Sequence, residues 1–287
     1  MNLNRRNFFK TMGVAGLTLA TGKKSGASSP ENVEKTEFMG MLYDSTRCLG
    51  CRACEIACAE AHSLPEPKDE LVTGVKRRTS ELQRTAVNKY NTSKGEALVK
   101  NQCMHCNEPA CAAACLTSAM YKTKEGPVIW RGDKCMGCRY CMVSCPFDVP
   151  KFEYNSPNPK IQKCDLCHDR IIKGEIPACA EICGEALMFG TRRELVTEAR
   201  KRIAENPDQY VNKIYGEDVA GGTGYLYLSA VPHEEIGLKE DLQNASYPAL
   251  TKGFLYSVPA VFVLLPPLLL GIHEATKDNN SNPEENE

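Results

Sequence analysis

The sequence predicts an α+β domain organised around cysteine-bound centres, followed by a single C-terminal transmembrane helix. The 287-residue chain contains 16 cysteines, an uncharged stretch at residues 253–272, and only 8 Phe, 11 Tyr and one Trp for an aromatic core. A chain of this length forms one or two domains. Its formal net charge of −1 gives no basic excess for binding nucleic acid, and its 42% hydrophobic content argues against wholesale disorder.

Residues 1–27 have the features of a Tat signal peptide. Arg5 and Arg6 precede a weakly apolar segment rich in Gly and Ala, and the small residues at 25–27 offer a loose cleavage site after Ala27. The apolar segment is too short for a stable membrane-spanning helix. The alternative is a disordered basic N-terminus. Because the Tat machinery exports folded proteins, this signal predicts a periplasmic protein whose cofactor is inserted in the cytoplasm.

Residues 40–240 form the predicted folded domain. Within it, residues 127–130 read as a short strand, and residues 221–228 read as a glycine turn that leads into a strand. Thr191 and Glu194 form a capping box, which predicts the start of a helix with one apolar face. Together these elements give the domain its α+β character.

Two connections in this domain are predicted to be irregular or exposed. Residues 146–159 contain four prolines, which argue against a helix. The long connection at 59–102 contains the basic cluster Lys76, Arg77 and Arg78. We interpret this cluster as a solvated face, with a partner-binding surface as the alternative.

Residues 253–272 are predicted to be a transmembrane anchor. About 20 uncharged residues at 1.5 Å rise just cover a hydrocarbon core of about 30 Å. Membrane helices tolerate prolines such as Pro259, Pro266 and Pro267 when neighbouring helices restore the lost hydrogen bonds. The alternative is a hairpin or a buried segment. Residues 273–287 are acidic and rich in Asn, and we expect them to be a disordered tail.

The cysteines fall into four groups of four, and none is left over. Successive cysteines in groups one and three are separated by two, two and three residues, whereas the third cysteine is displaced in groups two and four. The groups are, in chain order, Cys48, Cys51, Cys54 and Cys58; Cys103, Cys106, Cys111 and Cys115; Cys135, Cys138, Cys141 and Cys145; and Cys164, Cys167, Cys179 and Cys183.

This spacing is typical of [4Fe–4S] clusters. Three closely spaced cysteines wrap around one cluster, and the fourth lies on the following helix and points to a different cluster. Sixteen thiolates are enough for four clusters. Zinc is one alternative, although zinc sites use two separated pairs of ligands. Disulfides are another, although thiols two residues apart rarely reach the required geometry.

Four groups in this order resemble the electron-transfer subunits of membrane oxidoreductases. That family includes the beta subunit of respiratory formate dehydrogenase, the equivalent subunits of dimethyl sulfoxide, polysulfide and nitrite reductases, and the periplasmic iron–sulfur subunit of Hyb-type (hydrogenase 2) uptake hydrogenase. The resemblance covers residues 40–240. It implies a fold of tandem bacterial-ferredoxin-like units, each with two [4Fe–4S] clusters and related by pseudo-two-fold symmetry.

The resemblance also implies how the groups share clusters. In the family, groups one and four share two clusters, and groups two and three share the other two. The implied ligand sets are set A (Cys48, Cys51, Cys54, Cys183), set B (Cys164, Cys167, Cys179, Cys58), set C (Cys103, Cys106, Cys111, Cys145) and set D (Cys135, Cys138, Cys141, Cys115).

No catalytic constellation is found, which predicts a non-catalytic electron carrier. The five histidines are scattered: His62, His105, His168, His233 and His273. His105 and His168 flank cluster cysteines, where a donated hydrogen bond would tune a reduction potential; a plain surface role is the alternative. Arg139 and Lys163 also lie beside ligands, where a positive charge would raise a potential unless solvent screens it.

The Tat signal, the four cysteine groups and the membrane segment together resemble the Hyb-type subunit. The resemblance implies electron transfer from a periplasmic nickel–iron uptake hydrogenase to a multi-helix membrane subunit that reduces quinone. It places the chain on the periplasmic face of the cytoplasmic membrane, held by a single-pass anchor in the lipid. The alternative partner is a molybdopterin oxidoreductase acting on formate or on a sulfur or nitrogen oxyanion. A more distant alternative is a structural zinc-binding protein.

Overall fold

The computed structural model describes residues 37–277. The predicted signal peptide and residues 278–287 of the predicted tail lie outside this range. Of these, residues 37–251 form one compact unit, and residues 252–277 belong to a second. All four cysteine groups lie in the first unit, which therefore holds the candidate site.

A three-stranded sheet is the largest regular element of this unit. Its strand order is β8 (Leu187–Thr191), β1 (Met39–Asp44) and β9 (Tyr225–Leu228), with β1 antiparallel to β8 and parallel to β9. Side chains alternate along the strands, so Tyr43 faces one core and Leu42 faces another. The strand predicted within 221–228 is confirmed as β9.

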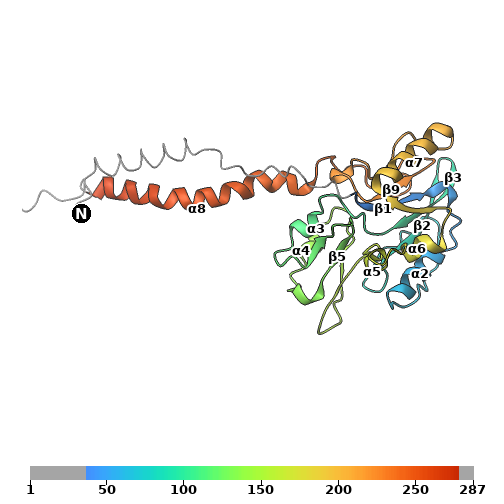
Figure 1. The fold of residues 1–287 in the computed structure, drawn as a ribbon, viewed down its shortest axis with the longest axis horizontal. Helices are drawn as coiled ribbons and strands as arrows, with labels where there is room; N and C mark the ends of the chain where they lie inside the picture. The colour runs from blue at the N-terminus through green and yellow to red at the C-terminus, as the bar shows by residue number, and fades with distance from the viewer. Residues whose placement is uncertain (1–36, 278–287) are drawn as a thin grey trace, which may run out of the picture. The chain divides into compact units, whose positions relative to one another are not determined.

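Helix α7 (Arg192–Glu205) covers one face of this sheet, as Figure 1 shows. Its buried Leu195 and Ala199 pack with Leu42 of β1 and with the apolar side chains of β9. The predicted capping box is confirmed: Thr191 accepts a hydrogen bond from the Glu194 backbone, and the Glu194 side chain accepts one from the Thr191 backbone.

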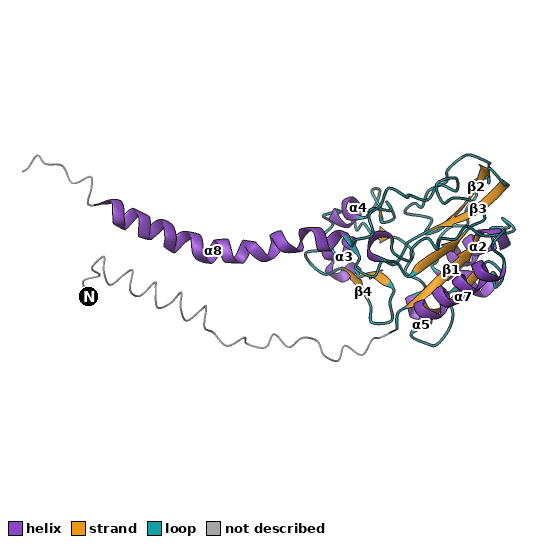
Figure 2. Cartoon of the chain, turned by 90° about the horizontal axis from the view of Figure 1, so that it is seen from above, coloured by secondary structure: helices purple, strands orange, loops and turns teal. Residues whose placement is uncertain are grey.

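The long connection between groups one and two contains an antiparallel hairpin of β2 (Ala86–Thr92) and β3 (Gly95–Asn101), shown in Figure 2. The interpretation of the basic cluster before it as a solvated face is wrong for Arg77. Its side chain is only 5% exposed and forms an ion pair of 2.7 Å with the fully buried Glu55. A buried carboxylate needs such a partner, so Arg77 holds the hairpin against the helix that carries the last two cysteines of group one.

Five of the cysteines lie within short helices, and the others lie in the connections between elements. Figure 1 shows α3, α4 and β5 gathered together, away from the three-stranded sheet. The strand predicted at 127–130 is confirmed as β5, and the proline-rich connection at 146–159 contains a single two-residue strand, β6. The elements are η1 (Ser45–Arg47), α2 (Ala53–Ala61), α3 (Ala110–Ala113), β4 (Met120–Lys122), β5 (Val128–Trp130), η2 (Gly132–Lys134), α4 (Tyr140–Ser144), β6 (Lys151–Phe152), β7 (Ile161–Gln162), α5 (His168–Ile171), α6 (Ala178–Ile182) and η3 (Val219–Gly221).

Helix α8 (Tyr247–Lys277) contains the whole predicted anchor and is longer at both ends. It continues through Pro259, Pro266 and Pro267 as one helix (Figure 2). By length and composition this helix can cross a membrane. Its most apolar segment is not buried against any other part of the chain that the structure describes. The first residues of the predicted tail, up to Lys277, are helical.

Candidate metal centres

Groups one and three have the same local backbone. A single turn of 3₁₀-helix precedes each group, and an α-helix starts just before its third cysteine. Between these elements, Gly50 and Gly137 have φ values of 70° and 73°, and Arg52 and Arg139 have values of 62° and 60°. Alternating left- and right-handed residues form concave nests of backbone N–H groups, which are common around iron–sulfur clusters.

Groups two and four share a different backbone. In each, a proline stands immediately before a short helix that carries the third cysteine: Pro109 before α3 and Pro177 before α6. Proline suits this position because a helix start has no use for its missing N–H. His105 and Leu166 occupy matching positions before the second cysteine and have positive φ values of 48° and 58°. The displaced third cysteine therefore has its own helix in both groups.

The sixteen cysteines are free thiols, and they form four neighbourhoods. In each neighbourhood, burial raises the pKa of at least one thiol, and nearby thiolates raise it further. The neighbours are Cys183 with Cys48 and Cys51, and Cys54 with Cys183; Cys58 with Cys179 and Cys167, and Cys164 with Cys58; Cys111 with Cys103, Cys145 and Cys106; and Cys141 with Cys115, Cys135 and Cys138. Neighbours also cross between the sets, since Cys179 acts on Cys54 and Cys103 acts on Cys164. The assignment of the ligands to sets A to D stays a prediction.

The chemistry of these thiols fits an iron–sulfur centre. Burial raises the pKa of Cys54, Cys58 and Cys106 to about 12, so without metal these groups are neutral at pH 7. Iron binds the thiolate, and metal binding therefore displaces the proton. Soft sulfur donors in sets of four select iron–sulfur clusters or zinc over harder cations.

Lys163 is buried, so solvent does not screen its charge. Its side chain is 3% exposed, and its Nζ lies 3.7 Å from Cys103 Sγ and donates to the backbone oxygen of Cys164 at 2.8 Å. By contrast, Arg139 is exposed and stacks over Phe152 at 5.2 Å. Of Arg139 and Lys163, only Lys163 has a charge that solvent does not screen.

The histidines differ in position. His105 is fully buried; its Nδ1 accepts from the Val128 backbone N–H at 2.9 Å, and its Nε2 has no partner among the described residues. Burial holds the pKa of His105 well below its usual range, so the ring is neutral. The proton is then on Nε2, a donor left available for a cluster bound by the cysteines on either side. His168 instead lies 3.3 Å from Glu125.

Two residues near the cysteines could not be found from the sequence. His62 Nε2 lies 3.6 Å from Cys167 Sγ and 3.4 Å from Asp165, and burial lowers its pKa. Lys100 is fully buried beside cysteines of sets A and B. No motif marks either residue, because both reach the site only through tertiary packing. His233 is also buried, which lowers its pKa to about 4.

Comparison with known proteins identifies relatives that include iron–sulfur subunits. A family model described as a 4Fe–4S dicluster domain matches residues 96–192. The hydrogenase-2 operon protein HybA of Escherichia coli O157:H7 is 35% identical over 319 residues, covering 98% of this chain and 97% of HybA. The formate dehydrogenase-O iron–sulfur subunit of Escherichia coli K12 is 31% identical over 247 residues, covering 81% of each chain. A protein of Nitratidesulfovibrio vulgaris is 46% identical over 286 residues, covering 96% of this chain and 77% of that protein.

The chain belongs to the family of iron–sulfur subunits that includes HybA and the formate dehydrogenase subunits. As a member of this iron–sulfur subunit family, it binds 4Fe–4S clusters through its cysteines and transfers electrons. The dicluster model spans groups two to four, and the alignment with HybA extends the match over group one.

Proposed function

We propose that the chain holds four [4Fe–4S] clusters in sets A to D and passes electrons between a periplasmic nickel–iron uptake hydrogenase and a quinone-reducing membrane subunit. The sixteen free cysteines in four groups of four, together with the match to a 4Fe–4S dicluster domain, support the cluster assignment. The full-length similarity to HybA, a hydrogenase-2 operon protein, supports the hydrogenase partner. In this proposal the chain itself transfers electrons and catalyses no reaction.

The proposed clusters lie in the order A, B, C, D. Cys54 of set A neighbours Cys179 of set B, and Cys164 of set B neighbours Cys103 of set C. Sets C and D are linked because α3 and α4, which pack together, are flanked by ligands of both sets. The shared backbones of groups one and three, and of groups two and four, support two ferredoxin-like units related by pseudo-two-fold symmetry.

The ends of this row are suited to partner subunits. Apolar side chains around set D are exposed, including Val143 (81%), Leu116 (83%) and Met136 (63%). At set A, Leu49 is 89% exposed. Just before α8, Ser246 donates a 2.5 Å hydrogen bond to Glu108, which lies between two ligands of set C in the sequence. The C-terminal end of the domain therefore lies beside the loop that carries ligands of set C.

We propose a Tat-exported protein on the periplasmic face of the cytoplasmic membrane, held by α8 as a single-pass anchor. The apolar composition of α8 supports the anchor. The alternative partner is a molybdopterin enzyme. The observation that supports this alternative is the 31% identity to a formate dehydrogenase subunit.

One purification tests both the partner and the clusters. The complex is solubilised from membranes of the native organism under anaerobic conditions and assayed for nickel, molybdenum, tungsten, iron and acid-labile sulfide. Nickel near one per complex supports the hydrogenase partner, whereas molybdenum or tungsten supports the alternative. About sixteen irons per chain are expected for four clusters. Zinc in place of iron would overturn the cluster assignment.

The nested ligand sets have a separate test. Cys183→Ser and Cys48→Ser change ligands of the same proposed cluster, although they are far apart in the sequence. Paramagnetic resonance of the reduced protein should show both variants altering one signal, while Cys58→Ser alters another. Different signals for Cys183→Ser and Cys48→Ser would show that the nested assignment is wrong.

A further inference from the structure

Two lysines are buried between the neighbourhoods of cysteines. Lys100 is 1% exposed and Lys163 is 3% exposed. Among the described lysines and arginines the other buried side chain is Arg77, which is paired with Glu55. An unpaired buried cation is strongly unfavourable unless negative charge lies nearby. Neither lysine has a carboxylate within ion-pair distance in the described part of the chain, and cysteines of the proposed ligand sets lie beside both.

Lys100 lies between sets A and B. The groups that act most strongly on the buried ammonium of Lys100 are the cysteines Cys179, Cys54, Cys164 and Cys58. Cys54 belongs to set A, and the other three belong to set B. The ammonium group therefore lies beside both sets.

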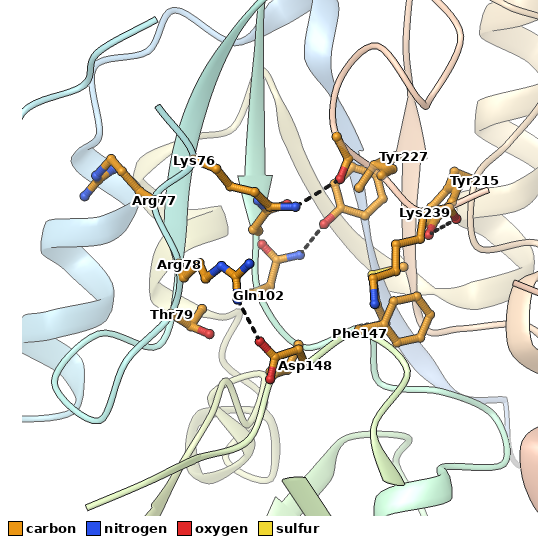
Figure 3. A pocket seen from close by; sticks show the side chains of 15 residues that line it. Lys76, Arg77, Arg78, Thr79, Gln102, Phe147, Asp148, Tyr215, Tyr227 and Lys239 are labelled. Carbon is orange, nitrogen blue, oxygen red and sulfur yellow. Dashed lines mark hydrogen bonds and ion pairs between the residues drawn. The ribbon is translucent and has the colours of Figure 1, made fainter. Parts of the chain in front are cut away.

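Hydrogen bonds hold Lys100 in place. Its Nζ donates to Gln102 Oε1 at 3.1 Å, the Gln102 amide donates to the Tyr227 hydroxyl at 2.8 Å, and that hydroxyl donates to the Lys100 backbone oxygen at 2.8 Å. Figure 3 shows Gln102 and Tyr227 joined in this way on the wall of a pocket of about 330 Å³. Because the network closes on itself, the charge has a fixed position.

Lys163 has the corresponding place between sets B and C. Its Nζ contacts Cys103 Sγ of set C and donates to the backbone oxygens of Val128 and of Cys164, a ligand of set B. For set D, neither lysine is among the strongest influences on Cys141 or Cys115.

We propose that Lys100 and Lys163 are fixed positive charges that raise reduction potentials, Lys100 those of clusters A and B and Lys163 those of clusters B and C. The inference rests on the proposed four-cluster function. Reduction adds one negative charge to a cluster, and a buried cation stabilises that added charge. Cluster B borders both lysines and cluster D borders neither, so each lysine should act on a different pair.

The test compares Lys100→Met and Lys163→Met with the wild type in the complete solubilised complex. Iron is counted first, and the midpoint potential of each cluster is then measured by paramagnetic resonance at controlled potentials. Cys51→Ser in set A and Cys138→Ser in set D, both at exposed positions, assign the end signals. Lys100→Met should lower the potentials of A and B, Lys163→Met those of B and C, and neither should shift D.

Lys239→Met is the matched control. Lys239 is an exposed cation on the rim of the same pocket (Figure 3), and its Nζ donates to the Pro146 backbone oxygen, next to a ligand of set C. Solvent screens this charge, so the variant should shift every potential less than the buried-lysine variants do. Lys100→Arg keeps the positive charge, so the potentials of clusters A and B should stay close to their wild-type values.

The possible outcomes distinguish a failure of the tuning role of the lysines from a failure of the proposed four-cluster function. Fewer than four clusters in the wild type would overturn the proposed function before any variant is compared. Full iron content with unchanged potentials at A and B in Lys100→Met would overturn the role of Lys100. Loss of iron from Lys100→Met is checked with Lys100→Gln, which is polar but uncharged. Iron loss from both would assign Lys100 to folding and overturn the tuning role.

Discussion

The half of the domain that holds sets A and B has a much larger core than the half that holds sets C and D. The A/B half comprises α2, α6, the three-stranded sheet and the β2–β3 hairpin. Large side chains fill its core, among them Tyr43, Tyr225 and Tyr227. The C/D half comprises α3, α4 and the β4–β5 hairpin. Its small buried cluster is Cys111, Met120, Val128 and Ile161.

This difference shows where the proposed clusters replace side chains as the core. Helix α4 has no buried residue, and its Val143 is 81% exposed. A small apolar core stabilises a fold only slightly, and small domains commonly rely on metal for the remainder. With so small a core, the C/D half is expected to depend more on its proposed clusters than the A/B half does.

Iron removal is expected to have the largest effect and to separate the two halves. After chelation, backbone amides of α3, α4 and β4–β5 should exchange hydrogen almost without protection, because little apolar burial remains there. The β8–β1–β9 sheet should keep part of its protection. Hydrogen exchange with mass spectrometry before and after chelation measures both. Equal loss of protection in the two halves would contradict the greater dependence of the C/D half on metal.

The buried ion pair in the A/B half is expected to have the next largest effect. Glu55→Gln leaves the buried Arg77 with only the half-exposed Asp69 as a charged partner. Breaking a buried pair costs about 3–5 kcal/mol. Glu181→Gln is the matched control, since its ion pair with Arg170 is exposed and worth about 0–1 kcal/mol.

Thermal unfolding and hydrogen exchange of the cluster-loaded protein measure this pair of variants. Glu55→Gln should lower protection in the β2–β3 hairpin, because the Val87 backbone N–H donates to Glu55. Protection in the C/D half should change little. Similar costs for Glu55→Gln and Glu181→Gln would contradict the buried role of Glu55.

The turns before groups one and three offer a third comparison. Asp44 caps η1 by accepting from the Thr46 backbone N–H at 3.1 Å, and it also binds Arg202 at 3.0 Å and Tyr210 at 2.8 Å. At the matching position before η2, Arg131 provides no side-chain cap. Group one is thus fixed by side chains that are absent at group three.

Asp44→Asn should destabilise the A/B half by about 1–3 kcal/mol, because it weakens hydrogen bonds to a buried carboxylate. Iron of cluster A should become easier to remove, since Cys48 directly follows η1. Arg131→Ala should have a smaller effect on cluster D. Timed iron release to a chelator measures both variants, and faster release from Arg131→Ala than from Asp44→Asn would reverse the expected order.

The sequence predicted the features that depend on local chemistry. The four cysteine groups follow from spacing, and the start of α7 follows from Thr191 and Glu194. Strand β5 was identified from a run of apolar residues between turn residues. In each of these cases neighbours in the chain contain the whole signal, so no tertiary information was needed.

Features that depend on distant contacts could not be predicted. Strand β1 pairs in parallel with β9, which lies at the far end of the domain sequence. The burial of Arg77 and Lys100 depends on partners brought together only by folding. A lysine in a strand reads as an exposed residue in a sequence, and only the surrounding cysteines make its burial possible.

The smallest expected effect concerns the cap of α7, which covers only the A/B half. Thr191→Ala removes one side of the capping box and should cost about 1 kcal/mol. Thr197→Ala on the same helix is the control, because exposed Thr197 donates only to the Arg193 backbone oxygen. Hydrogen exchange should rise at the start of α7 in Thr191→Ala and remain unchanged in α3 and α4. Because α7 packs on β1 and β9 and not on the C/D half, a change in α3 or α4 would show that the two halves unfold as one unit.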